Sequence, residues 1–332
     1  MWPVALLVDS SLSLLAPCDL KKGSPLTFIE AQLVRDKAGE TGVRIAYCLS
    51  EGTTNYAWEP HLNLDPVDIP LRGPIAFNGP AEFTASTFTI GADGVTIDIA
   101  FDDGTHRVQW HVHQPRPWQG FDFLAPPAAA MDEPTSLFFP YMRQFSFVRQ
   151  PLEFSLTING VPAQPQKLPF LWGGRQALGL KASRGSVVVE LMPDKEPCLT
   201  DADPGAVTDS DGNLLALRRT AGALPVELTF TPGLPPVAAL SSADSLAVQW
   251  HLVVGEDPAM GGTVEFARDA SGTTMTWSVT QAWKGVPQRG AAWLLTRLIP
   301  FLRRWPLHYS WSGSVDVSGA LHGRWVNAKP KR

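Results

Sequence analysis

Apolar and polar residues alternate in short runs along most of the chain, and turn-forming residues separate the runs. A period of two places successive side chains on opposite faces, which is typical of a β-strand with one buried face. The runs predict strands at Leu26–Val34, Val43–Leu49, Ala81–Ile90, Val95–Phe101, His106–Gln114, Leu152–Ile158, Ser186–Met192, Leu214–Arg219, Val226–Thr231, Ser245–Val254, Thr263–Arg268, Thr273–Thr280 and Ser310–Val317. We therefore expect a protein that is almost entirely β.

Several of the intervening turns predict hairpins. Asp103-Gly104 and Asn159-Gly160 supply the positive φ that a tight hairpin needs, and Asp211-Gly212 does the same later in the chain. Strands joined so locally form antiparallel meanders, which favours two antiparallel β-barrel or β-sandwich domains of a lipocalin-like kind.

One helix is expected near the C-terminus, over Arg289–Arg304. Its apolar residues cover a wide face, and Pro300 would kink it or end it. Three interpretations stay open: a helix packed on a barrel, an apolar lid over a ligand, or a segment that makes transient contact with a membrane.

The length of 332 residues favours two domains, because a single core usually stops growing below that size. The acidic, proline-containing stretch Asp194–Asp211 is the best linker candidate. We place an N-terminal β-sandwich or β-barrel domain at residues 1–195 and a C-terminal lipocalin-like β-barrel domain at residues 196–332.

Charge and cysteine usage narrow the partners and the compartment. The net charge of −5 argues against nucleic acid as a partner, because phosphate backbones attract basic surfaces. The three cysteines are an odd number without metal-binding spacing, which favours reduced thiols in a cytoplasmic protein. The N-terminal apolar run lacks a positively charged start, so an export signal is disfavoured. The oligomeric state stays open.

The motifs of common catalytic classes are absent. No GxSxG element, P-loop or GxGxxG fingerprint follows any predicted strand, so we expect no cofactor. His111 and His113 share one face of a predicted strand, but a metal would need a third ligand that the sequence does not suggest, so we expect no metal. The alternatives for these two histidines are a hydrogen-bonded pair on the surface or an acid–base role in a cavity.

The sequence contains twelve tryptophans, and a conjugated apolar ligand could stack on several of them. The alternative for each tryptophan is that it packs in the hydrophobic core. The residues predicted to bind substrate are Trp172, Trp250, Trp277, Trp283, His111 and His251. The residues predicted to be catalytic, as polar groups that hold one end of the ligand, are Tyr141, Arg143 and Glu265.

Three stretches, taken in order, carry a resemblance to a known family. They are Val108–Gly120; Phe138–Phe145 with the later Leu156–Val161 and Leu171–Gly174; and Tyr309–Gly319 with Gly323 and Trp325. They resemble the calycin-like double β-barrel family of carotenoid 1,2-hydratases, AttH-type proteins and lipocalin-like Diels–Alderases. The resemblance implies two barrel-like domains and a ligand cavity, with cofactor-free chemistry on long apolar substrates.

The chain departs from the hydratases of that family at two positions. Their Tyr-x-Asp pair, whose Asp is the proposed proton donor, would fall at Phe170-Leu171-Trp172, and their His-x-Trp would fall near Arg143-Gln144-Phe145. Without that acid, protonation of a C=C bond is disfavoured.

Four functions stay open. The first is a cofactor-free cyclase or pericyclase that acts on an apolar polyene, polyketide or isoprenoid in secondary metabolism, where holding a reactive conformer suffices. The second is a lipocalin-like protein that binds a lipophilic small molecule without turnover. The third is an isoprenoid hydratase or isomerase, which needs an internal acid such as Asp98 or Glu265. The fourth is an interaction module.

Overall fold

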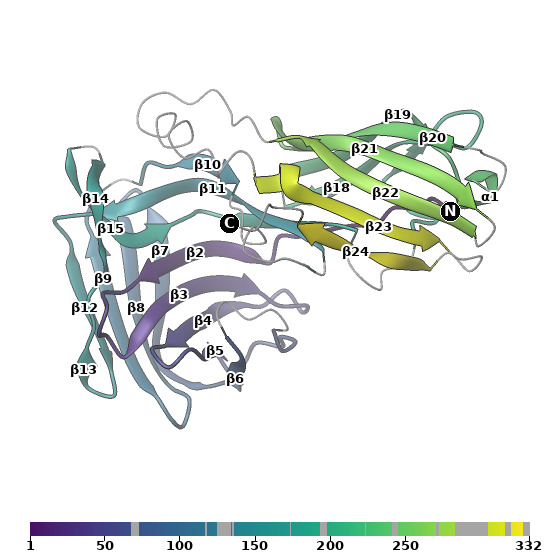
Figure 1. Ribbon diagram of the computed structural model, residues 1–332. Helices are drawn as coiled ribbons and strands as arrows, with labels where there is room; N and C mark the ends of the chain where they lie inside the picture. Colours follow the sequence, from purple (N-terminus) through teal and green to yellow (C-terminus); the bar gives the residue numbers. More distant parts are fainter. Residues whose placement is uncertain are drawn as a thin grey trace. The chain divides into compact units, whose positions relative to one another are not determined.

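A computed structural model describes residues 1–67, 73–116, 118–124, 134, 136–172, 174–192, 198–222, 224–240, 245–269, 272–282, 305–315 and 320–327. The described chain is nearly all β, as the alternation predicts (Figure 1). Within it, helical structure is confined to α1 (Val237–Leu240) and the 3₁₀ turn η2 (Trp305–His308). The helix expected at Arg289–Arg304 and the predicted ligand contact Trp283 lie outside the described residues. No described helix has the length and apolarity to cross a bilayer.

The chain divides into two compact units. Unit 1 comprises Met1–Ser10, Leu124–Tyr141 and Val187–Arg332, and unit 2 comprises Ser11–Phe123 and Met142–Ser186. Each unit is therefore built from segments that are distant in the sequence. The sequence predicts a boundary between two independently folding domains at residues 195 and 196, and that boundary stays a prediction.

Unit 1 contains an eight-stranded antiparallel meander. Its strands, in spatial and chain order, are β17 (Ala206–Thr208), β18 (Leu214–Ala221), β19 (Leu224–Leu234), β20 (Ser245–Val254), β21 (Asp257–Asp269), β22 (Gly272–Gln281), β23 (Tyr309–Val315) and β24 (Leu321–Asn327). The sheet curls in Figure 1. Unit 1 also contains β1 (Leu6–Asp9), which pairs antiparallel with β16 (Ser186–Leu191).

Unit 2 contains two sheets. The first includes β2 (Leu12–Asp19), β3 (Leu26–Arg35), β4 (Thr41–Leu49), β5 (Thr54–Trp58), β6 (Ile75–Pro80), β10 (Phe121–Leu124), β11 (Leu137–Arg149), β14 (Lys167–Trp172) and β15 (Arg175–Ala182). Its order is β11-β15-β2-β3-β4-β5-β6, with β10 beside β11 and β14 beside β15; β11 begins in unit 1 and continues into unit 2. The pair β5–β6 is parallel.

The second sheet of unit 2 has the order β13-β12-β9-β8-β7. Its strands are β7 (Glu82–Gly91), β8 (Gly94–Asp102), β9 (Arg107–Gln114), β12 (Glu153–Ile158) and β13 (Val161–Pro162). One buried cluster contains Ile29 and Ile45 of the first sheet together with Ile97 and Trp110 of the second. The two sheets thus enclose a shared core as a β-sandwich, and the opposite face of the first sheet is left for other contacts.

The hairpin turns form where the sequence places them. Gly104 has a φ of +88° between β8 and β9, and Asn159 and Gly160 have φ values of +49° and +78° between β12 and β13. Positive φ at both central residues is the requirement of a type I′ turn, which Asn-Gly satisfies best. These turns set the registers of the second sheet.

Candidate functional site

Two of the predicted ligand-binding tryptophans meet in the core of unit 1. Trp250 and Trp277 are fully buried, their ring centroids lie 5.7 Å apart, and Trp277 Nε1 donates to Met275 Sδ at 3.2 Å. His251 on β20 and Glu265 on β21 alternate to the face opposite Trp250, because Trp250 pairs with Gly262 and Glu265 with Ala247. Glu265 is exposed and His251 half-buried. The structure therefore brings the two tryptophans into contact and places His251 and Glu265 on the other face of the sheet.

The other polar candidates are dispersed. Tyr141 is buried in unit 1, whereas Arg143, two residues later, is exposed in unit 2. His111 lies on a partly exposed face of the second sheet of unit 2, between Asp98 (3.8 Å from Nδ1) and Glu153 (3.7 Å from Nε2). Among the described residues, no three His, Cys, Asp or Glu side chains are arranged to hold a metal. A catalytic or binding role for these residues stays a prediction.

Six aromatic side chains form one continuous cluster on the first sheet of unit 2. They occur as three pairs separated by one residue, and they are Phe121 and Phe123 on β10, Phe145 and Phe147 on β11, and Phe170 and Trp172 on β14. We call this cluster the aromatic surface. Of its members, only Phe145 is fully buried, and the rest are half-buried. A single one of them, Trp172, was predicted from the sequence to touch a ligand.

The rings of the aromatic surface pack in mutual contact. Phe147 lies 5.4 Å from both Phe170 and Trp172, and Phe123 stacks on Phe145 at 5.1 Å between ring centroids. Phe121 connects the two groups, at 5.7 Å from Phe145 and 5.9 Å from Trp172. Such spacings are those of favourable aromatic pairs. The sheet thus presents a rigid apolar platform whose rings keep part of their area accessible.

The aromatic surface borders a row of charged groups on the same face. Phe147 pairs directly with Lys181 across β11 and β15, so both side chains leave the sheet on one side. Lys181 Nζ donates to Asp19 Oδ2 on β2 at 2.6 Å. Asp19 also borders an open hollow of about 730 Å³ at the turn between β2 and β3, a volume within the range of small-molecule sites.

A buried carboxyl continues this row on β3. Cys18 pairs with Leu180 and both are buried in the sandwich core, so the alternating Pro17 and Asp19 leave the sheet on the other face. Glu30 is paired opposite Pro17 and is therefore on that face as well. Only 9% of the residue is exposed. A carboxyl in such a position needs an explanation, because burial of an acid is costly.

Two polar side chains hold Glu30 in place. Gln32 Nε2 donates to Glu30 Oε1 at 2.5 Å, and Arg44 Nε donates to Gln32 Oε1 at 2.5 Å. Burial is the largest influence and raises the pKa of Glu30, while the Gln32 hydrogen bond and the charges of Arg44 and Lys181 oppose it. The net effect is a raised pKa, which favours the neutral acid.

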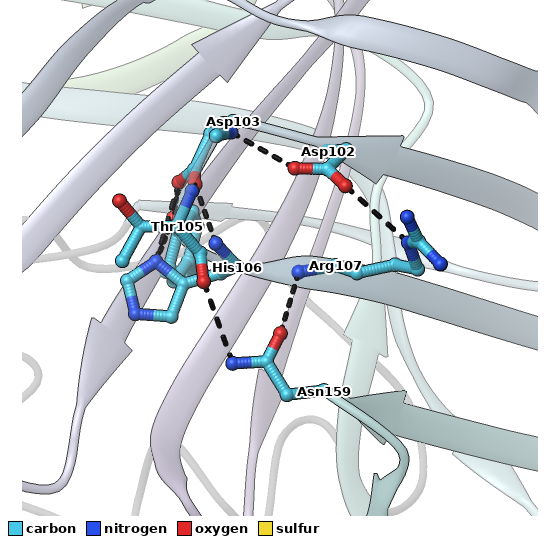
Figure 2. Close-up of polar contacts among 8 residues, drawn as sticks. Asp102, Asp103, Thr105, His106, Arg107 and Asn159 are labelled. Atoms are coloured by element: carbon cyan, nitrogen blue, oxygen red, sulfur yellow. Dashed lines mark hydrogen bonds and ion pairs between the residues drawn. The ribbon is translucent and has the colours of Figure 1, made fainter.

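A second polar cluster anchors the turn between β8 and β9. The Asp103 side chain is 1% exposed, and it accepts hydrogen bonds from the Tyr47 hydroxyl and from the backbone N–H groups of Thr105 (2.9 Å) and His106 (2.7 Å). Figure 2 shows this turn and its hydrogen bonds to Asn159 on the adjacent turn. Burial tends to raise the pKa of Asp103, but the Tyr47 and backbone hydrogen bonds outweigh it and lower the pKa.

The Asp103 cluster acts as a turn anchor rather than as a reaction site. Of three hydrogen bonds to its carboxylate, two stay within the turn and one comes from Tyr47 on β4 of the other sheet. The pKa of the Tyr47 hydroxyl is raised, chiefly by burial. A phenol that resists ionisation is a poor base at neutral pH. The aromatic surface with the Lys181–Glu30 row is therefore the stronger candidate site.

Comparison with known proteins identifies no relative. No family model matches the chain, and neither a curated protein nor a solved structure matches it. The family that the sequence motifs resemble therefore stays a prediction.

Proposed function

We propose that the protein binds an elongated apolar small molecule on the aromatic surface of unit 2 and catalyses its cyclisation without a cofactor. The observation that carries this proposal is the continuity of the half-buried aromatic platform with a fixed polar row that starts at Lys181. Aromatic faces suit a conjugated chain, and one polar end orients it. A pericyclic ring closure needs little more than a held conformer and one polarising hydrogen bond.

The fixed polar row favours an enzyme over a carrier. A carrier needs only an apolar surface, whereas turnover needs a polar group aimed at one atom and held by supporting contacts. Lys181 is held by Asp19, and Glu30 is held by Gln32, which is itself held by Arg44. The carrier function is the alternative if the bound compound leaves unchanged.

An acid-driven isomerase or hydratase is the second candidate, because Glu30 is a buried acid. The acids first considered for that chemistry, Asp98 and Glu265, are exposed. Glu30 is buried and its pKa is raised, so it keeps its proton to a higher pH than an exposed glutamate does.

Ligand analysis separates rearrangement of the bound compound from its hydration and from simple transport. The protein is purified from its own host, its bound compound is released, and that compound is compared by mass spectrometry and chromatography with an extract of a host lacking the protein. Cyclisation or isomerisation gives a new compound of unchanged mass, hydration adds the mass of water, and a carrier returns the compound unaltered. Recovery of no apolar compound would contradict the proposal.

Substitution of Phe147 tests the binding surface. The Phe147 ring contacts Phe145, Phe170 and Trp172, so we expect Phe147→Ala to weaken binding of the hydrocarbon probe 1,6-diphenylhexatriene about tenfold. Probe fluorescence measures the affinity.

The matched control is Leu171→Ala, because Leu171 is 64% exposed on β14 and alternates to the face opposite Phe170 and Trp172. Its affinity for the probe should stay within about twofold of the parent protein. Equal losses in the two variants would place the probe elsewhere on the molecule.

A further inference from the structure

We propose that Glu30 donates a hydrogen bond to a carbonyl oxygen of the bound molecule, so that the substrate is a conjugated carbonyl compound rather than a hydrocarbon. This inference rests on the proposed function, because it assigns the substrate class of the same site.

The hydrogen bonds around Glu30 all run towards one of its oxygens. Arg44 donates to the Gln32 carbonyl oxygen, and the Gln32 amide donates to Glu30 Oε1. Within the described part of the chain, Oε1 accepts the one hydrogen bond that this carboxyl makes, which leaves Oε2 available. A neutral carboxylic acid in this setting presents on Oε2 an O–H group that can donate. Its complement is an acceptor such as a carbonyl.

The charges that face Glu30 come from three neighbouring strands. They are Arg44 on β4 and Lys181 on β15, whose positive charges lower the pKa of Glu30, and Asp19 on β2, which pairs with Lys181. Because burial outweighs the two cations at Glu30, the acid stays neutral into a higher pH range than an exposed glutamate. A neutral acid that donates to a carbonyl withdraws electron density from the conjugated system, and this lowers the barrier to cyclisation.

The position of Glu30 fits an elongated ligand. The path across the sheet from Phe147 on β11 to Glu30 on β3 crosses β15 and β2. Neighbouring strands lie about 4.8 Å apart, so the three steps span roughly 14 Å. A conjugated chain of that length with its apolar end on the aromatic surface reaches Glu30 with a carbonyl at the other end or near it.

Two probes of similar shape test the inference. Dibenzylideneacetone contains a conjugated ketone between two phenyl groups, whereas 1,6-diphenylhexatriene contains no oxygen. We expect Glu30→Met, which has no donor, to weaken dienone binding about fivefold to tenfold. The variant should also abolish the red shift of the dienone absorption that the hydrogen bond to its carbonyl causes. Its affinity for the hexatriene should be unchanged. Glu30→Gln keeps an N–H donor at the same position and should retain most of the dienone affinity. Glu82→Gln, at an exposed position on β7 of the same unit, serves as the matched control.

A pH titration of the unmodified protein covers the case in which Glu30→Met fails to fold. Because the pKa of Glu30 is raised, dienone affinity should be full at low pH and fall as pH rises through that pKa, whereas hexatriene affinity stays flat. Dienone binding that is insensitive both to pH and to the loss of Glu30, while hexatriene binds, overturns this inference and leaves the proposed function standing. Failure of both probes to bind overturns the proposed function together with the inference.

Discussion

Trp277→Ala is expected to lower the free energy of unfolding by about 3–5 kcal/mol, because the indole is fully buried and its removal leaves a cavity. Its ring packs on Trp250 at 5.7 Å and on Phe230 at 6.1 Å between centroids. Denaturant unfolding followed by circular dichroism measures the loss. Binding of 1,6-diphenylhexatriene to the folded variant should be unchanged, since the aromatic surface belongs to unit 2.

Trp172→Ala is the matched comparison, because Trp172 is half-buried on the aromatic surface. We expect Trp172→Ala to lower the free energy of unfolding by only about 1–2 kcal/mol and to weaken binding of the probe. The two tryptophans should thus show opposite patterns of stability and binding. If Trp277→Ala removed probe binding while stability stayed intact, the ligand would lie inside unit 1 and the proposed site would be wrong.

Asp103→Ala is expected to lower the free energy of unfolding by about 2–4 kcal/mol. The substitution leaves the buried Tyr47 hydroxyl and the N–H groups of Thr105 and His106 without their acceptor. Asp102→Ala is the matched control, because its neighbouring carboxylate is 37% exposed and bonds Arg107 Nε at 3.3 Å on the surface. That control should cost less than about 1 kcal/mol.

The loss in Asp103→Ala should depend on pH in a defined direction. Because the folded-state pKa of Asp103 is lowered, its stabilising effect is fully present above the unfolded pKa of about 3.9 and disappears as pH falls through the folded pKa. The stability difference between the parent protein and the variant should be constant near neutral pH and shrink below about pH 4. A difference that grows on acidification would contradict the ionised state of Asp103.

The fold was predictable where local pattern determines it. The hairpin turns at Asp103-Gly104 and Asn159-Gly160 form as expected because glycine and asparagine adopt positive φ readily, as Gly104, Asn159 and Gly160 do here. The alternation of Ser245–Val254 gave a strand with the same bounds as β20. The composition of each unit was not accessible in this way, since the pairing of β1 with β16 joins segments that are far apart in the sequence.

The candidate site was largely missed from the sequence for a physical reason. In the strand Leu26–Val34, Glu30 alternates to the same face as Gln32, and two adjacent polar positions on one face are typical of a surface facing water, so nothing local shows that Glu30 is buried. The aromatic surface did leave a signal. Three aromatic pairs with one intervening residue, at 121/123, 145/147 and 170/172, place two rings on the same face of each strand.

The order in which the units can be completed follows from the arrangement of their segments. Unit 2 needs nothing after Ser186, whereas Leu6–Asp9 finds its partners only at Val188–Leu191. During synthesis, the first strand of unit 1 therefore waits while nearly the whole of unit 2 emerges from the ribosome. Until Val188–Leu191 has been translated, the backbone hydrogen-bonding groups of Leu6–Asp9 have no partner strand, so this short strand is an unpaired edge for that interval.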